Sequence, residues 1–430
     1  MAFVSEYGEF RLHTVRAIPV VLFIANPSDL RTCMQATIRR RIPNRHMSAA
    51  ATEHPAVRSR HCFLAAAAVT LVSAGTAHAQ SSVTLYGEVD AAVRYVSAFD
   101  GEHSNTYLSS SGMSPVFFGL KGTEDLGGGM RAIFALENQF SAANGAASPI
   151  STGPQLFGRQ AFVGLDTDNY GTLTAGHQYN ALNVFFNYAP IWVDGASPFY
   201  VGGDNLVLGY RMNSSVVYKK SAGPVSFQLD YGFGGQPGSL AEGATTGANV
   251  AYHFADAMLG AAYEQYKSAD GASMAQNWTA GGRYAFGKAT LFAGYMHNSV
   301  SGTESQRRNL YFSGAQYTVT PDILLSGGYF YYQQSSCTGT CTAGQTVAAG
   351  SAGSTQYGIS GGGGTGHANI LAISAKYLLS RRTTLYAEVD TYRLRGGAAT
   401  DQIYYWTGID NKTLKSVNQN AVMIGMTHSF

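Results

Sequence analysis

Apolar and polar residues alternate one by one along much of this chain. From Val83 to Tyr95 every second residue is apolar or glycine, while the charged residues Glu88, Asp90 and Arg94 lie between them. A period of two predicts a strand with one apolar face and one polar face. Strands of soluble proteins run to about 5 to 6 residues, whereas a strand that crosses a bilayer needs about 9 to 11, so this length favours a membrane strand.

Fifteen further segments show comparable patterns, which makes sixteen expected strands. The sixteen expected strands, including the first, lie at 83–95, 114–122, 129–141, 156–166, 170–178, 210–220, 224–232, 248–255, 257–267, 276–286, 288–298, 308–319, 322–334, 368–379, 383–393 and 418–430.

The connections between these strands alternate between short turns and long polar loops. The short ones are 124–128, 166–169, 221–223, Asp256, Gly287, 320–321 and 380–382; the long ones lie near 97–113, 142–155, 179–209, 233–247, 268–275, 299–307, 335–367 and 394–417. Short periplasmic turns and long extracellular loops are typical of outer-membrane barrels. An even number of strands closes an antiparallel sheet without an unpaired edge. The pattern therefore predicts an all-β fold, a 16-stranded antiparallel transmembrane β-barrel.

The beginning of the chain has the features of a secretory signal. An apolar run, 63–72, follows Arg58 and Arg60 and precedes Ala77-His78-Ala79, the order of a signal peptide and its cleavage site. We expect a signal peptide at 47–79 with cleavage after Ala79, and the barrel domain at 80–430. Residues 1–46 then form an N-terminal extension. We attribute it to a start codon that was assigned too far upstream, and the alternative is a genuine pro-segment.

Composition changes this picture in two ways. No stretch of about 18 apolar residues exists, so a membrane-spanning helix is not expected. Without residues 1–79 the chain has 19 basic and 22 acidic residues, so the formal charge of +2 belongs to the leader and nucleic acid is not an expected partner.

Two cysteines remain in the expected mature chain. Cys337 and Cys341 lie four positions apart in a segment rich in Gly, Ser and Thr. An oxidising compartment favours a disulfide between them, and with the nearest histidine at His367 a zinc site is not expected.

The last residues, from Val422 to Phe430, alternate again and end on an aromatic side chain. Aromatic girdles mark the interfaces of membrane barrels, so we expect Phe430 at the periplasmic interface and interpret it as a C-terminal assembly signal.

Six segments of the chain resemble the general porins of Gram-negative bacteria, of the type common in relatives of Burkholderia, Bordetella and Neisseria. They occur in the family's order and cover the chain from Gln80 to Phe430: Ser82–Gly87, Gly119–Gly127, Gly158–Leu165, Gly171–Gly176, Asn213–Tyr218 and His428–Phe430. The resemblance implies a homotrimer of barrels, each a water-filled channel for passive diffusion of ions and small hydrophilic solutes. It also implies that the third extracellular loop folds inward and narrows the pore.

The resemblance also implies which residues line this constriction. Arg159 and Arg211 match the family's constriction arginines, and Arg94 faces the lumen by its place in the alternation. The third long loop, 179–209, supplies Asp194 and Asp204. At two further positions the resemblance implies arginine, but this chain has Phe117 and His177 there. The resulting candidate constriction set is Arg94, Arg159, Arg211, His177, Asp194 and Asp204. Each charged residue could instead be an ordinary solvated side chain of a polar lumen.

Other motifs do not have the context that their chemistry requires. The tract 358–366 fits both a nucleophile elbow and a G-x-G-x-x-G pattern, but it does not lie between a strand and a helix. We therefore expect no enzyme activity, no catalytic residues, no metal and no cofactor. A substrate-specific channel, a barrel-embedded hydrolase and a plugged structural barrel are the alternatives. The expected partners are further copies of the chain, outer-membrane lipid and lipopolysaccharide, the barrel assembly machinery and small solutes.

Overall fold

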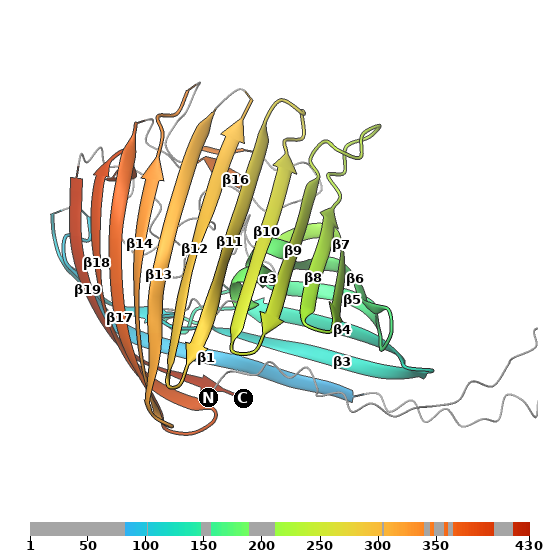
Figure 1. Cartoon of the computed structure of the whole chain (residues 1–430), viewed down its shortest axis with the longest axis horizontal. Helices are drawn as coiled ribbons and strands as arrows, with labels where there is room; N and C mark the ends of the chain where they lie inside the picture. The colour runs from blue at the N-terminus through green and yellow to red at the C-terminus, as the bar shows by residue number, and fades with distance from the viewer. Residues whose placement is uncertain are drawn as a thin grey trace, which may run out of the picture. The chain divides into compact units, whose positions relative to one another are not determined.

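The computed structural model describes residues 82–100, 102–147, 156–188, 211–302, 305–338, 345–347, 357–359, 364–399 and 416–430. The expected extension and signal peptide lie outside these residues, so the boundaries at 46, 79 and 80 stay predictions. Within the described residues, seventeen strands form one antiparallel sheet (Figure 1).

The strands of this sheet are β1 (Ser82–Val96), β2 (Asn105–Ser110), β3 (Phe117–Gly127), β4 (Met130–Gln139), β5 (Gln160–Thr167), β6 (Gly171–Tyr179), β7 (Arg211–Ala222), β8 (Val225–Gly232), β9 (Thr245–Phe254), β10 (Ala257–Lys267), β11 (Met274–Phe286), β12 (Ala289–Ser301), β13 (Gln306–Thr320), β14 (Ile323–Gln334), β17 (Gly366–Leu378), β18 (Thr383–Gly396) and β19 (Ser416–Ser429). Two three-residue strands, β15 (Gln345–Val347) and β16 (Tyr357–Ile359), pair with each other. The helical elements are α3 (Ala181–Tyr188) and the 3₁₀ turn η2 (Gly397–Ala399).

The sheet closes on itself. From β3 to β14 each strand pairs with the next along the chain, β14 pairs with β17, and β17 to β19 continue the series. Strand β1 pairs with β19 from Glu88 opposite Ser429 to Val96 opposite Ala421. Strands β2 and β3 pair with the late and the early part of β1 respectively, so together they occupy one place in the wall. The barrel therefore has sixteen places, which confirms the expected 16-stranded antiparallel barrel.

The sequence pattern does not predict the division between β2 and β3, because it places 105–110 in a long loop. The carboxylate of Asp90 explains the break: it accepts backbone N–H groups from Gly112, Met113 and Ser114 at 3.1, 2.9 and 2.8 Å. Pro115 has no N–H to offer a neighbouring strand. The segment 111–116 thus leaves the ladder and is tied to the barrel wall by one acidic side chain.

Most other expected strands differ from the observed ones by no more than three residues at either end. Strand β10 has the expected bounds, while β12 and β13 extend further and leave only 302–305 between them in place of the expected long loop. The backbone hydrogen bonds between these strands continue past the residues whose polarity alternates. The sequence pattern therefore predicts strands that are too short.

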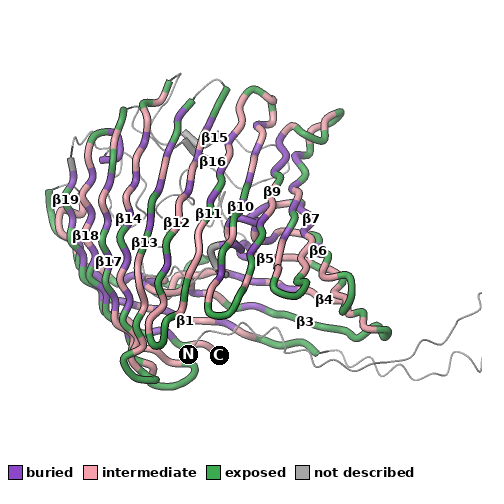
Figure 2. The backbone as a smooth tube through the Cα atoms, viewed as in Figure 1, coloured by how far each residue is buried: buried purple, intermediate pink, exposed green. Residues whose placement is uncertain are grey.

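Alternation along the strands separates two faces, and Figure 2 shows exposed and buried residues following one another along β10 to β19. One set of positions is exposed and apolar on the outside of the barrel, for example Leu85, Val93 and Ile424. The other set points inward and includes the charged residues of β1, such as Asp90 and Arg94, which are buried. An apolar outside fits a barrel whose outer wall contacts lipid.

The inner face is not polar throughout. On β12 to β18 a buried cluster includes Met296, Phe312, Phe330, Tyr332 and Ile370. Leu182 and Phe185 of α3 belong to the same cluster, and α3 lies against β8 to β11 (Figure 1). The inner face of the barrel wall therefore has a polar part and an apolar band, although a uniformly polar lumen was expected.

The two ends of the barrel differ. The connections at one end are short, such as 128–129, 223–224 and 287–288, and the chain terminus Phe430 lies at this end. The long connections lie at the other end, which we call the long-loop end. Among the described residues, no helix is both long and apolar enough to cross a membrane.

Candidate functional site

Charged side chains gather on the inner face of β1, β4 to β7 and β18. They reach this face because they stand at alternate positions of strands whose other positions are apolar and face outward. Three arginines of the expected constriction set lie within this part of the wall, and each has a different environment.

Arg94 is neutralised by two acidic residues of β18. Its Nη2 lies 2.7 Å from Oδ2 of Asp390 and its Nη1 lies 3.7 Å from Oε1 of Glu388, and all three side chains are buried. Two carboxylates around one guanidinium leave no positive charge for a passing anion. Arg94 therefore ties β1 to β18 near the barrel seam, and its two partners were missed by the sequence analysis.

Arg159 lies directly before β5 and contacts an acidic residue and an aromatic ring. Its Nε donates to Oε2 of Glu137 on β4 at 3.1 Å, and its guanidinium carbon lies 4.2 Å from the centre of the Phe117 ring. Phe117, where the resemblance described above implies an arginine, instead supports Arg159 through a cation–π contact.

Glu137 is the centre of a polar network that the sequence analysis did not identify. Besides Arg159, its carboxylate accepts the hydroxyl of Tyr86 at 2.7 Å and the amide of Gln160 at 3.0 Å. The pair of Arg159 and Glu137 carries no net charge. The signal that could have revealed it is a charged residue, Glu137, inside the expected strand 129–141.

Arg211, the first residue of β7, meets Arg159 through one tyrosine. The guanidinium carbon of Arg211 lies 4.7 Å from the centre of the Tyr179 ring, and its Nη2 donates to the Tyr179 hydroxyl at 3.0 Å. The guanidinium carbon of Arg159 lies 6.0 Å from the same ring. The two arginines predicted for the constriction are thus brought together around Tyr179.

His177 lies near these arginines but is held by neighbours. Its Nε2 lies 3.0 Å from the backbone oxygen of Gly158, and its Nδ1 contacts Oδ1 of Asn213. The two ring nitrogens therefore contact the segment before β5 and strand β7. His177 thus connects the two chain segments that carry Arg159 and Arg211.

The expected inward loop begins with helix α3. Asn180 caps the helix by accepting the N–H of Asn183 at 2.9 Å, and Asn249 of β9 donates its amide to the backbone oxygen of Ala181 at 2.7 Å. These contacts hold α3 against the inner wall. The rest of the expected loop, with Asp194 and Asp204, lies outside the described residues.

Two buried carboxylates face the amino end of α3. Asp230 and Glu264 both interact with the backbone N–H of Ala181, where the helix dipole favours negative charge. Between their strands lies Gly247, at which a Cβ would come within 2.4 Å of an oxygen of each carboxylate. The absent side chain at 247 is what lets these acids meet beneath the helix.

Three further candidates have separate places in the molecule. Phe430 closes the seam, since its N–H donates to the oxygen of Gly87 at 3.0 Å and its own oxygen accepts the Gly87 N–H at 3.3 Å. Cys337 is disulfide-bonded, but Cys341 lies outside the described residues, so the pairing of the two stays a prediction. Within the described part of the chain, no three His, Cys, Asp or Glu side chains gather as metal ligands.

Comparison with known proteins identifies relatives across the barrel. The family model described as Gram-negative porin matches residues 65–397. An outer membrane porin protein of Bordetella pertussis is 32% identical over 185 residues, which are 40% of this chain and 47% of that protein. "Outer membrane porin protein 32" of Delftia acidovorans is 42% identical over 110 residues, 26% of this chain and 30% of that protein. The chain thus aligns with less than half of the length of these relatives.

Solved structures resemble the barrel over a larger share of its length. The "Anion-selective porin from Comamonas acidovorans" superposes with a TM-score of 0.64 and 25% identity, covering 82% of this chain and all of the other. OmpF of Salmonella typhi, in a complex with daunomycin, superposes with a TM-score of 0.55 at 15% identity over 81% of this chain and 97% of the other, which shows the shared fold.

Proposed function

The chain belongs to the Gram-negative porin family, and from this premise we propose that it forms a water-filled channel for passive diffusion of ions and small hydrophilic solutes across the outer membrane. The observation that carries the proposal is the closed 16-place barrel, with apolar residues outside and the Arg159, Tyr179 and Arg211 cluster inside. A closed antiparallel barrel satisfies every backbone group in lipid, and a barrel of sixteen strands is wide enough for an aqueous path.

The constriction is proposed to lie between the arginine cluster and the loop that starts with α3. Charged side chains facing a narrow aqueous gap select ions by the sign that dominates, and they orient polar solutes. Asp194 and Asp204 are proposed to supply acidic groups from the loop. Because Glu137 pairs with Arg159 and two carboxylates pair with Arg94, we propose a weaker preference for anions than three free arginines would give.

The remaining features of the proposal follow the family and the sequence. The short-turn end with Phe430 lies in the periplasm and the long-loop end faces outward. The mature protein begins after Ala79, forms a homotrimer, and has a Cys337–Cys341 disulfide in an external loop. Phe430 is proposed to be the signal for the barrel assembly machinery. The chain is proposed to have no enzyme activity, since it belongs to a family of channels.

The test is a planar-bilayer recording with protein expressed as the full chain and extracted from outer membranes. Conductance steps in groups of three support a trimer of open channels, and mass spectrometry of the same sample locates the first residue. An absence of conductance from correctly folded barrels would contradict the channel. Saturable flux of one solute would assign a substrate-specific channel instead.

A further inference from the structure

The lumen carries a second set of basic side chains, away from the arginine cluster. Alternation along their strands places four residues of this set on the inner face: Lys121 of β3, Lys219 of β7, Arg283 of β11 and Lys376 of β17. Their neighbours support this placement, since Leu120, Tyr284 and Tyr377 are exposed on the outside of the barrel. Val217, two residues before Lys219, is buried on the inside. We call these four residues the basic ring.

The four strands of the basic ring stand at equal intervals around the wall. Strands β3, β7, β11 and β17 occupy the second, sixth, tenth and fourteenth of the sixteen places, so four places separate each from the next. All four strands run toward a short turn. Lys219, Arg283 and Lys376 each stand four residues before the turn residues Gly223, Gly287 and Ser380. The basic ring therefore surrounds the lumen on all sides, near the short-turn end.

The side chains of the basic ring are accessible to the water of the lumen. Lys121 is exposed, and the other three are half-buried. The inward arginines nearer the long-loop end are different, because Arg94, Arg159, Arg211 and Arg308 are only 1%, 8%, 3% and 2% exposed. Accessible positive charge in the described part of the lumen is therefore found mainly toward the short turns.

The inward acidic residues of the short-turn end stand on one side of the barrel. They are Glu88 of β1, Asp125 of β3 and Asp166 of β5. Arg131, the remaining inward basic residue at this end, lies 2.7 Å from Oδ2 of Asp166. On the other side, the described acidic residues near the short turns of β7 to β17 are Asp256 and Asp322, which belong to the turns. The lumen wall from β7 to β17 is consequently basic at this end.

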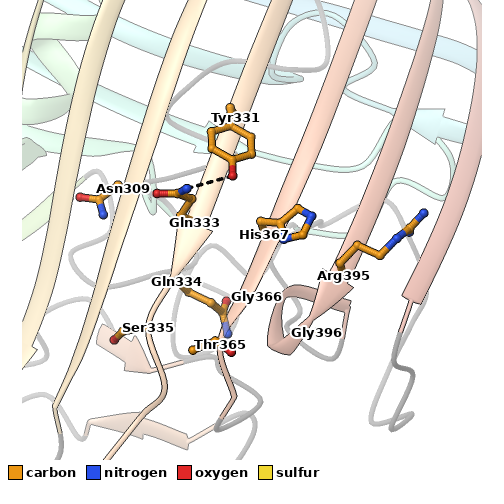
Figure 3. A pocket seen from close by; sticks show the side chains of 10 residues that line it. All are labelled: Asn309, Tyr331, Gln333, Gln334, Ser335, Thr365, Gly366, His367, Arg395 and Gly396. Atoms are coloured by element: carbon orange, nitrogen blue, oxygen red, sulfur yellow. Dashed lines mark hydrogen bonds between the residues drawn. The ribbon is translucent and has the colours of Figure 1, made fainter.

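The exposed arginines at the opposite end of the barrel do not face the lumen. Arg395 lies at a groove of about 500 Å³ on the outer wall, and Figure 3 shows Asn309, Gln333, His367 and Arg395 following one another across the strands that form it. Leu394, the neighbour of Arg395, is buried on the inner face, so Arg395 itself faces outward. Ions inside the barrel therefore meet the basic ring without a matching set of exposed arginines at the long-loop end.

We propose that the basic ring is a second selectivity element of the channel, which concentrates multivalent inorganic anions such as sulfate and phosphate at the short-turn end of the lumen. The inference rests on the proposed channel function. Four charges spread around a wide aqueous lumen act on ions through their field, so the valence of an ion decides the effect. A doubly charged anion is attracted twice as strongly as chloride, and potassium is repelled.

This assignment moves the main source of anion preference away from the constriction. There, Glu137 neutralises Arg159, and Glu388 and Asp390 neutralise Arg94. Every ion that crosses the barrel must also pass the basic ring.

The test removes three charges of the basic ring in the variant K121Q/R283Q/K376Q. Lys219 is left unchanged, because Asp230 acts on it electrostatically and also contacts α3. Reversal potentials are measured on single channels of the full chain extracted from outer membranes, under gradients of potassium chloride and of potassium sulfate near 0.1 M.

The expected size follows from the distance of these charges from the pore axis. In a barrel of sixteen strands the charged groups lie about 12 Å from the axis, and the Debye length at 0.1 M is about 10 Å. Coulomb's law then predicts that the permeability ratio of chloride to potassium falls about threefold in the variant, and that of sulfate to potassium about fivefold. At 1 M salt, where the Debye length is about 3 Å, both effects should vanish.

Two matched variants serve as controls. K288Q/R381Q/R382Q removes three exposed charges from the short turns at the same end of the barrel and should keep the ratios of the parent. R283K/K376R keeps the charges of the basic ring and should do the same.

Unchanged ratios in K121Q/R283Q/K376Q, at normal conductance, would overturn the inference. An equal loss in K288Q/R381Q/R382Q would overturn it as well and assign the effect to the charge of the whole short-turn end. Should the triple variant not fold, Arg283→Gln and Lys376→Gln alone should each lower the sulfate ratio about 1.7-fold. A parent without conductance would contradict the proposed function, which distinguishes that failure from a conducting parent whose selectivity does not depend on the basic ring.

Discussion

Replacing Glu137 with Gln should raise the preference of the channel for anions. Glu137 cancels the charge of Arg159, whose Nε lies 3.1 Å from its carboxylate. Glutamine has the same shape and keeps one oxygen that can accept from Tyr86 or Arg159. The substitution therefore removes one negative charge from the arginine cluster with little change in packing.

The size of the effect follows from Coulomb's law. In water, a unit charge acts on an ion that passes about 7 Å away with about 0.6 kcal/mol. At 0.1 M salt the Debye length is about 10 Å, and screening reduces this energy to about 0.3 kcal/mol. Loss of the carboxylate favours anions and disfavours cations by this amount each. The ratio of anion to cation permeability should therefore rise about threefold, since the combined change is about one RT.

The assay is the reversal potential of single channels under a gradient of potassium chloride near 0.1 M. Glu102→Gln is the matched control, because it removes the same charge from an exposed residue of the connection between β1 and β2. It should leave the permeability ratio unchanged. An unchanged ratio for Glu137→Gln, or a shift toward cations with normal conductance, would refute the role assigned to this charge.

Three further substitutions probe the contacts inside the barrel. Arg94→Met leaves its two carboxylate partners buried without their cation and should lower the free energy of unfolding by about 3–5 kcal/mol, measured by urea titration of the detergent-solubilised barrel; an equal loss in Arg94→Lys would contradict a role of the charge. Tyr179→Ala removes the ring between Arg159 and Arg211, so it should cost about 1–3 kcal/mol and increase single-channel conductance, whereas Tyr179→Phe should retain most of the stability. Gly247→Val places a side chain between the carboxylates at the amino end of α3 and should cost about 1–3 kcal/mol; stability equal to the parent would disprove this packing.

The number of strands could be read from the sequence because one buried and one exposed face impose a period of two. The strand 257–267 was predicted with its observed bounds, because the turn at Asp256 and the polar segment 268–275 mark its two ends. The break between β2 and β3 could not be read in this way. It depends on three N–H groups that bind Asp90, a residue more than twenty positions earlier.

The site was predictable only in part for the same reason. Alternation placed Arg94 on the inner face, but its partner Asp390 is 296 positions away and becomes its neighbour only when the barrel closes. Glu388 and Asp390 do stand at alternate positions of an expected strand, and that pattern could have indicated two inward acids. The meeting of Arg159 and Arg211 at Tyr179 depends on side-chain geometry, which the period of a strand does not specify.

The seam between β1 and β19 determines when this molecule can become a barrel. Glu88 pairs with Ser429 and Gly87 with Phe430, so β1 finds its second neighbour only after β19 has been made. A sheet that lacks this pairing has two unpaired edges, and each edge can pair with another chain. Closure joins two strands from opposite ends of the sequence. The conformational entropy lost in this step is therefore that of closing a loop almost as long as the barrel domain. A chain without β19 would leave the edges of β1 and β18 unpaired, so the barrel closes only when Ser416–Ser429 is in place.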